Sequence, residues 1–254
     1  MNRFWAMLFV AVPILAIAIF VASAFNIAPL TGTWMPEQVS QQSETIDWLY
    51  LLFHVVAAFT LAFTGLLLFL AMFRSRPDGT ARFIRGNTKL EIVWTVIPAA
   101  ALIFLAIYQS EAWTSNKFGV PDQEPLTARV IARQYQWEFV YPGEDGVFGN
   151  GDDLRSINRL IVPQKKHVVL ELESHDVIHS FFVPKLRLKQ DMVPGTVARV
   201  WFSPTKTAEL EILCAELCGW GHYNMRASMQ IVSPAEFDSF LLELNEPVQS
   251  EDSQ

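Results

Sequence analysis

Cysteine is scarce in this chain of 254 residues, which has only Cys214 and Cys218. Two cysteines this close in an exported protein ordinarily form a disulfide. The motif Cys-x-x-Cys-His is absent, which excludes covalent attachment of a c-type haem. A basic excess is absent too: residues 112–254 hold 13 basic and 20 acidic side chains, residues 1–111 hold six of each, and the formal net charge is −7. This balance disfavours nucleic acid as a partner and suits a basic one, or simple solubility.

Hydrophobic residues make up 51% of the chain and are concentrated in three apolar runs. The runs cover residues 4–25, 47–73 and 89–109. Each approaches or exceeds the roughly 20 residues that cross a bilayer as a helix, which is long for a buried core helix. We predict a membrane-anchored protein in which residues 45–111 form a transmembrane helical hairpin. Residues 1–25 are either a first transmembrane helix or a signal peptide, because Ala22-Ser-Ala24 matches a cleavage pattern.

The short link between the second and third runs is basic. Its charged residues are Arg74, Arg76, Arg82, Arg85 and Lys89 against the single Asp78. Such an excess marks the cytoplasmic side of a membrane. We therefore predict a multi-pass protein of a bacterial-type inner membrane, with everything after about residue 111 on the outer, periplasmic side. Within the second run, His54 is expected to bond a neighbouring helix.

From about residue 127 the pattern changes to short alternating or β-rich segments. They cover residues 127–133, 136–141, 167–173, 197–202 and 209–214. Turn signals such as Pro142-Gly143 and Pro194-Gly195 separate them. Short strands at this spacing predict a β-sandwich or barrel over residues 125–233. Residues 234–254 are expected to form a short helix followed by a polar tail.

Two thiols, an imidazole and a thioether fall within twelve residues, Cys214-Ala-Glu-Leu-Cys218-Gly-Trp-Gly-His222-Tyr-Asn-Met225. Soft sulfur ligands with imidazole favour copper or zinc, and a thioether favours copper. Gly219 and Gly221 weaken a helix here, so a loop between two strands is predicted. A second imidazole must come from elsewhere, and spacing alone does not choose between His175 and His179; His167 is a more distant candidate.

This run, together with Val177-Ile-His179-Ser-Phe and the helical hairpin, resembles cytochrome c oxidase subunit 2 over roughly residues 45–240. The resemblance implies a cupredoxin-like β-sandwich that holds the dinuclear copper A centre. Cys214 and Cys218 would bridge two copper ions. The remaining copper ligands would be His179, His222, Met225 and the backbone carbonyl of Glu216.

The resemblance also implies roles for three other side chains. The carboxylate of Glu216 would bind a Mg²⁺ ion at the interface with subunit 1. Glu91, at the start of the third run, would lie at the entrance of a proton path, although an acidic residue there would also stabilise the start of a helix. Electrons would be received near Tyr135 and Trp137, where a tyrosine replaces the tryptophan usual in the family.

By this resemblance the chain is the electron-accepting subunit of a terminal oxidase. Its partners would be subunit 1, subunit 3 and a c-type cytochrome, and the complex would reduce oxygen to water and translocate protons. The chain would itself carry no catalytic acid–base set. The alternative is an exported zinc- or copper-binding structural or carrier module, since two Cys and two His satisfy tetrahedral Zn²⁺.

The acidic segment of residues 142–153 has three possible interpretations. It is an acidic docking patch, a loose Ca²⁺ site or a solvated hairpin turn.

Overall fold

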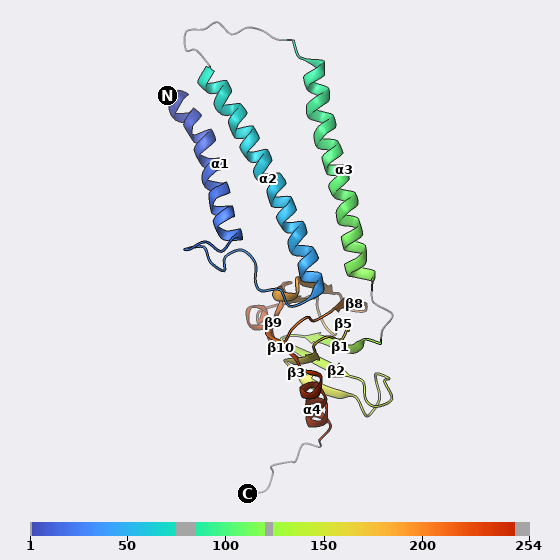
Figure 1. The fold of residues 1–254 in the computed structure, drawn as a ribbon. Coiled ribbons are helices and arrows are strands. Elements are labelled where there is room, and N and C mark those ends of the chain that lie inside the picture. The colour runs from blue at the N-terminus through green and yellow to red at the C-terminus, as the bar shows by residue number, and fades with distance from the viewer. Residues whose placement is uncertain (1, 75–84, 120–123, 247–254) are drawn as a thin grey trace. The chain divides into compact units, whose positions relative to one another are not determined.

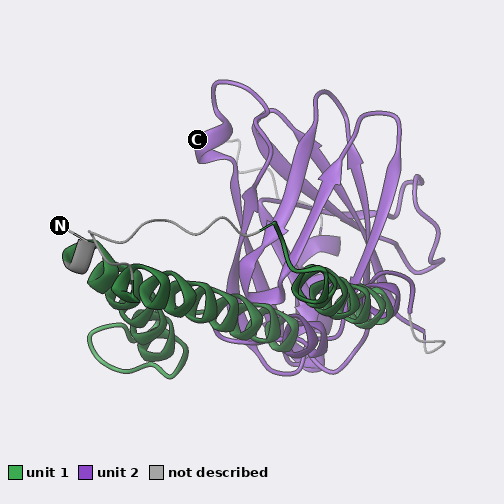
Figure 2. Ribbon diagram, turned by 90° about the horizontal axis from the view of Figure 1, so that it is seen from above, with its two compact units in different colours: residues 1–36, 47–112 green, residues 37–46, 113–254 purple. Residues whose placement is uncertain are grey.

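The computed structural model describes residues 2–74, 85–119 and 124–246 (Figure 1). It divides into two compact units, the first formed by residues 1–36 and 47–112 and the second by residues 37–46 and 113–254 (Figure 2). Most of the predicted basic link (residues 75–84) and the end of the predicted polar tail (residues 247–254) lie outside the described residues.

Three long helices account for the apolar runs: α1 (Asn2–Ala24), α2 (Gln41–Arg74) and α3 (Thr88–Phe118). Each is long and apolar enough to cross a membrane, and the chain itself leaves most of their large hydrophobic side chains exposed. Such helices need lipid or other subunits around them. α2 and α3 continue beyond the apolar runs at 47–73 and 89–109, because polar residues can extend a helix into the interfacial layer and water.

Within the first unit, α1 packs closely on α2. A Cβ atom at Gly65 would lie 2.4 Å from the carbonyl oxygen of Phe9, so only glycine permits this approach. His54 contributes a ring stacked on Phe20 of α1, with 5.5 Å between ring centroids. Its Nδ1 lies 2.8 Å from the carbonyl oxygen of Tyr50. The hydrogen bond of Nδ1 thus stays within α2, one turn back, and the ring contacts α1; a bond from the other ring nitrogen to a neighbouring helix stays a prediction.

The second unit is a β-sandwich of two five-stranded sheets. The first has the order β3-β2-β1-β5-β8 and comprises Leu154–Ile157, Gln136–Tyr141, Leu126–Arg133, Val168–Ser174 and Val197–Phe202. The second has the order β4-β10-β9-β6-β7 and comprises Arg159–Pro163, Arg226–Val232, Ala208–Cys214, His179–Val183 and Leu188–Met192. The pairs β1–β5 and β4–β10 are parallel, and the others are antiparallel. This confirms the predicted fold class of apolar helices followed by a β domain.

The core of the sandwich lies between the sheets and is rich in aromatic side chains. Trp137, Phe139 and Phe181 are fully buried. The hydroxyl of Tyr141 donates to the carbonyl oxygen of Ile161 and accepts from its amide, both at 2.9 Å, and so joins β2 to β4. Helix α4 (Pro234–Asn245) closes one end of the core, with Phe237 and Phe240 against the ring of Tyr141.

Helix α4 starts where the sequence placed it, and the reason is local. Ser233 and Glu236 form a reciprocal capping box, and Pro234 occupies the first turn. The chain between β2 and β3 (residues 142–153) is a hairpin connection closed by its own side chains. Asp145 accepts from the amide of Val147 at 2.8 Å, and Asp153 accepts from the amide of Gly149 at 2.8 Å.

The first turn of α2 belongs to the β unit. Gln42 Oε1 accepts from the amide of Ser203 at 3.0 Å, and the Ser43 hydroxyl donates to the carbonyl oxygen of Lys185 at 3.0 Å. These buried polar side chains thus fix the first turn of α2, which is part of the second unit, to the sandwich.

Candidate metal centre

The sulfur-rich run forms a loop that connects the antiparallel strands β9 and β10. Cys214 is the last residue of β9, and Met225 immediately precedes β10. The register pairs Leu213 with Arg226, so the two ends of the loop are held side by side. Cys218 lies in the loop, and His222 begins a single turn of 3-10 helix, η2 (His222–Asn224). The predicted loop between strands is confirmed.

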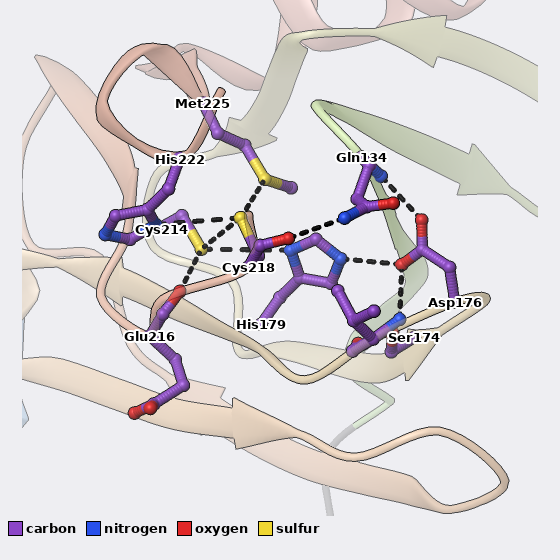
Figure 3. A network of polar contacts seen from close by, with 10 residues as sticks. Gln134, Ser174, Asp176, His179, Cys214, Glu216, Cys218, His222 and Met225 are labelled. Carbon is purple, nitrogen blue, oxygen red and sulfur yellow. Dashed lines mark hydrogen bonds and ion pairs between the residues drawn. The ribbon is translucent and has the colours of Figure 1, made fainter. Parts of the chain in front are cut away.

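The loop brings soft donor atoms together around the two sulfur atoms (Figure 3). Cys214 Sγ and Cys218 Sγ are 3.8 Å apart. Cys214 Sγ lies 3.2 Å from the carbonyl oxygen of Glu216. Cys218 Sγ lies 3.6 Å from His222 Nδ1 and 3.7 Å from Met225 Sδ. Each sulfur therefore has its own set of neighbouring donors.

His179, and not His175, supplies the second imidazole. It is the first residue of β6, is completely buried, and places Nδ1 3.8 Å from Cys214 Sγ. One imidazole nitrogen of His179 and both cysteine sulfurs lie within 4.8 Å of one another. His175 is exposed after β5, and His167 Nδ1 is hydrogen-bonded to the Ser203 hydroxyl at 2.6 Å. The spacing in the sequence left His175 and His179 as alternatives; because His179 begins β6, it is the one that lies beside the sulfurs.

Asp176 and Gln134 surround the site with a second layer of hydrogen bonds, which the sequence did not indicate (Figure 3). Asp176 Oδ1 lies 2.8 Å from His179 Nε2, and Asp176 Oδ2 accepts from the amide of Gln134 at 2.7 Å. The side chain of Gln134 donates to the carbonyl oxygen of Cys218 at 2.7 Å. With its Nε2 proton held by Asp176, His179 turns the lone pair of Nδ1 towards the sulfurs. The three-residue spacing from Asp176 to His179 was the available signal.

The two thiols differ in acidity. Burial opposes ionisation of Cys214, but hydrogen bonds with His179 and the backbone around it lower the pKa of its thiol to about 6. Burial and the neighbouring Cys214 raise the pKa of Cys218 to about 12. Burial disfavours the imidazolium of His179, yet the bonds with Cys214 and Asp176 outweigh it and raise its pKa. Cys214 is therefore the thiol that ionises first, and a metal ion bound by both sulfurs would have to displace the proton of Cys218.

The cysteines are not joined. A sulfur–sulfur distance of 3.8 Å is far beyond the roughly 2.05 Å of a disulfide. Both are free thiols, with Cys218 buried and Cys214 half-buried. Two thiols, two imidazoles, a thioether and a carbonyl oxygen suit a thiophilic metal such as copper, whereas they suit Mg²⁺ or Ca²⁺ poorly. The residues present therefore fit a copper site.

The other residues predicted from the sequence lie at different distances from this cluster. The Glu216 side chain is exposed and points away from the sulfurs, while its carbonyl faces them (Figure 3). Tyr135 is 39% exposed, and its ring lies directly beneath Gly219 and Gly221 of the loop. Trp137 is buried, with its ring centroid 6.3 Å from that of His179. Glu91 lies in the first turn of α3, in the other unit, where it is exposed.

A two-sheet β domain that carries a His-Cys-Cys-Met cluster and follows apolar helices defines the class of membrane-anchored, cupredoxin-like proteins. Two family models match the chain: cytochrome c oxidase subunit II, transmembrane domain, over residues 28–111, and cytochrome c oxidase subunit II, periplasmic domain, over residues 134–232. The chain belongs to the cytochrome c oxidase subunit 2 family. It is a membrane-bound subunit of a terminal oxidase, with its β domain on the periplasmic side.

Two relatives agree with this family in sequence. A probable cytochrome c oxidase subunit 2 of Rickettsia bellii is 31% identical over 208 residues, which cover 76% of this chain and 77% of that one. The cytochrome c oxidase subunit 2 of Thermostichus vulcanus is 30% identical over 261 residues, covering 81% and 77%. The crystal structure of the periplasmic domain of subunit II from Bradyrhizobium japonicum is 27% identical and covers 49% of this chain and 96% of that one, with a TM-score of 0.44.

Proposed function

We propose that the cluster is a dinuclear copper A centre and that this chain receives electrons for the oxidase. Cys214 and Cys218 would bridge the two ions, with His179 and His222 as the imidazole ligands. Met225 and the carbonyl of Glu216 would complete the two coordination shells. Bound copper would supply one-electron transfer at this position, between a c-type cytochrome outside and the haem of subunit 1.

One observation carries this proposal: different donors flank each sulfur. Glu216 O and His179 Nδ1 lie on the Cys214 side, and His222 Nδ1 and Met225 Sδ lie on the Cys218 side. A single tetrahedral Zn²⁺ would need only the two thiolates and two imidazoles, so the thioether and the carbonyl oxygen would coordinate nothing. A carrier that releases its copper gains little from a buried Met225 and Cys218.

The surrounding residues would then have distinct roles. Tyr135, which is partly exposed and packs against the ligand loop, would meet the electron donor, and Trp137 would fill the interior beside His179. Glu91 would admit protons from the cytoplasmic side towards subunit 1. The exposed carboxylate of Glu216 would hold Mg²⁺ at the interface with subunit 1. Together with subunits 1 and 3, the chain would support reduction of oxygen to water coupled to proton translocation.

The test is metal analysis and electron paramagnetic resonance of the full chain purified within its complex. We expect two copper ions for each copy of this chain and a mixed-valence signal shared by both ions. Replacement of Met225 by Leu keeps the volume of this buried side chain and should alter the signal while the domain stays folded. One zinc ion and no mixed-valence signal would reject the copper A assignment in favour of a structural zinc module.

A further inference from the structure

A small hollow of about 130 Å³ lies in the second unit, away from the metal centre. The bases of the two helices contribute Gln42 and Ile46 of α2 and Trp113 and Lys117 of α3, and strands β7 and β8 contribute the opposite wall. The volume has room for about four water molecules, or for one tetrahedral oxyanion group. All lining residues belong to residues 37–46 and 113–254, which form one compact unit.

The charge of the hollow is opposite to that of the domain around it. Lys117, Arg187 and Lys189 line it, and none of its lining residues, all within the described part of the chain, is acidic. By contrast, residues 112–254 as a whole hold 13 basic and 20 acidic side chains. A cationic pocket in an acidic domain selects an anion.

The cations are held by neighbouring polar groups. Arg187 Nη1 donates to the carbonyl oxygens of Pro184 and Lys185 at 3.1 and 3.2 Å. Lys117 Nζ donates to Gln190 Oε1. Lys189 Nζ pairs with Asp191 at 3.3 Å, where both side chains are about half exposed, so this pair is weakened by water. The three cations are therefore already bonded within the protein, and a bound anion would compete with Asp191 for Lys189.

The helical residues that line the hollow lie just beyond the apolar runs in the sequence. The third apolar run ends near residue 109, so Trp113 and Lys117 follow it by about 6 and 12 Å at 1.5 Å per residue. Ile46 and Gln42 precede the second run in the same way. Trp113 is 60% exposed, as expected for a ring in the interfacial belt, and a lysine beyond it can extend along the headgroup layer.

The walls combine this charge with apolar surface from Leu188, Val200 and Trp201. A soluble oxyanion would bury none of this apolar surface. A lipid whose phosphate enters the hollow can cover it with its glycerol and upper acyl carbons. We propose that this hollow binds the phosphate group of an anionic phospholipid from the outer leaflet, which fixes the β domain to the membrane surface.

The test uses the purified oxidase containing the full chain, washed free of lipid and then titrated with phosphatidylglycerol or phosphatidylcholine, with native mass spectrometry as the readout. Lys117→Gln and Lys189→Gln should each weaken retention of phosphatidylglycerol about fivefold, since one cation near an anionic lipid is worth ~1 kcal/mol. Retention of phosphatidylcholine should not change. Lys166→Gln is the matched control, because Lys166 is an exposed lysine of the same domain outside the hollow.

Three outcomes would overturn the proposal. Equal retention of phosphatidylglycerol by both variants and the control would show that no anionic lipid is held there. Displacement of the lipid by millimolar inorganic phosphate would assign the hollow to a soluble oxyanion. Loss of a partner subunit from the variants, with lipid retention unchanged, would assign it to a protein contact.

Discussion

Asp176 links the candidate metal site to the turn that follows β1 in the first sheet. Its carboxylate accepts from His179 Nε2 and from the amide of Gln134, while Gln134 holds the carbonyl of Cys218. One carboxylate thus orients a proposed copper ligand and anchors the segment that positions another. Burial opposes its ionisation, but the bonds from Gln134 and His179 lower the pKa of Asp176, so it is charged at neutral pH.

Asp176→Asn should weaken copper binding while leaving the fold intact. An asparagine has one acceptor oxygen and no charge, so either His179 or the Gln134 amide loses its partner. Loss of such an outer hydrogen bond typically costs about 10–100-fold in metal affinity. Titration against a copper chelator, read by the mixed-valence signal, measures the change. Asp238→Asn, at an exposed site on α4, is the control and should bind as the wild type does; equal affinity in all three proteins would contradict the role.

Glu216 offers a second prediction at this scale, because its carbonyl and its carboxylate face different surroundings. Glu216→Gln removes the charge and keeps the backbone, so the Mg²⁺ proposed at the interface with subunit 1 should be lost while the copper spectrum is retained. Paramagnetic substitution with Mn²⁺ in the assembled oxidase reports the interfacial metal. A variant that loses the copper signal together with the Mn²⁺ signal would show that the two roles are not separate.

Local and distant ligands differ in how far the sequence reveals them. Cys214, Cys218, His222 and Met225 fall in one short run whose donor types already define a soft metal site. His179 could not be separated from His175 by spacing, because only the start of β6 decides which ring faces the sulfurs. Asp176 and Gln134 are 42 positions apart and meet only through the fold.

At the scale of elements, the Tyr141 hydroxyl ties β2 to β4, on opposite sheets of the sandwich. Because it both donates to and accepts from Ile161, a neutral phenol satisfies two buried backbone groups at once. Burial raises the pKa of Tyr141 above its ordinary value near 10. A pKa raised on folding means that this contribution is complete below pH ~10 and declines as the pH rises further.

Tyr141→Phe should therefore lower the stability of the β domain at neutral pH. It should also reduce the further decrease in stability that the wild type shows as the pH rises above ~10. The ring remains, but the amide and carbonyl of Ile161 lose their partner, at a cost of about 1–3 kcal/mol. Thermal unfolding followed by near-ultraviolet circular dichroism between pH 7 and pH ~11 measures both effects. Tyr223→Phe removes a hydroxyl from a ring that is 72% exposed and should change neither; an identical shift in that control would refute the argument.

The sequence predicts those strands in which apolar and polar side chains alternate over several residues. It does not predict the strands that lack this alternation. β1, β2, β5, β8 and β9 were predicted almost to the residue. The missed strands are short or interrupted: β3 has four residues, and β7 reads Leu-Lys-Gln-Asp-Met. β4 and β6 are five-residue strands with a charged or ligand residue at the first position, and pairing in the second sheet stabilises them.

At the scale of the whole molecule, the chain joins two environments. The β unit holds the proposed electron-accepting site on the periplasmic side, and Glu91 lies in the first turn of α3, in the helical unit. The first turn of α2 is hydrogen-bonded to the sandwich through Gln42 and Ser43, within the β unit, and the same helix continues into the helical unit. The proposed roles in electron transfer and proton uptake therefore belong to different units of the chain, and separate substitutions can test them.

Glu91→Ala should slow oxygen consumption without slowing reduction of the copper centre. A carboxylate at a helix start also stabilises the helix, by well under the strength of a buried ion pair, so a purely structural role predicts little change in turnover. A proton-transfer role predicts a decrease of about tenfold or more, because a positioned proton-transfer group contributes roughly 10²–10⁴ in rate. Glu111→Ala, near the other end of α3, is the matched control. Stopped-flow reduction of copper and steady-state oxygen consumption, measured on the same preparations, separate the two steps. Normal turnover in the Glu91 variant would reject the proton-transfer role and leave this side chain only a role in stabilising the start of α3.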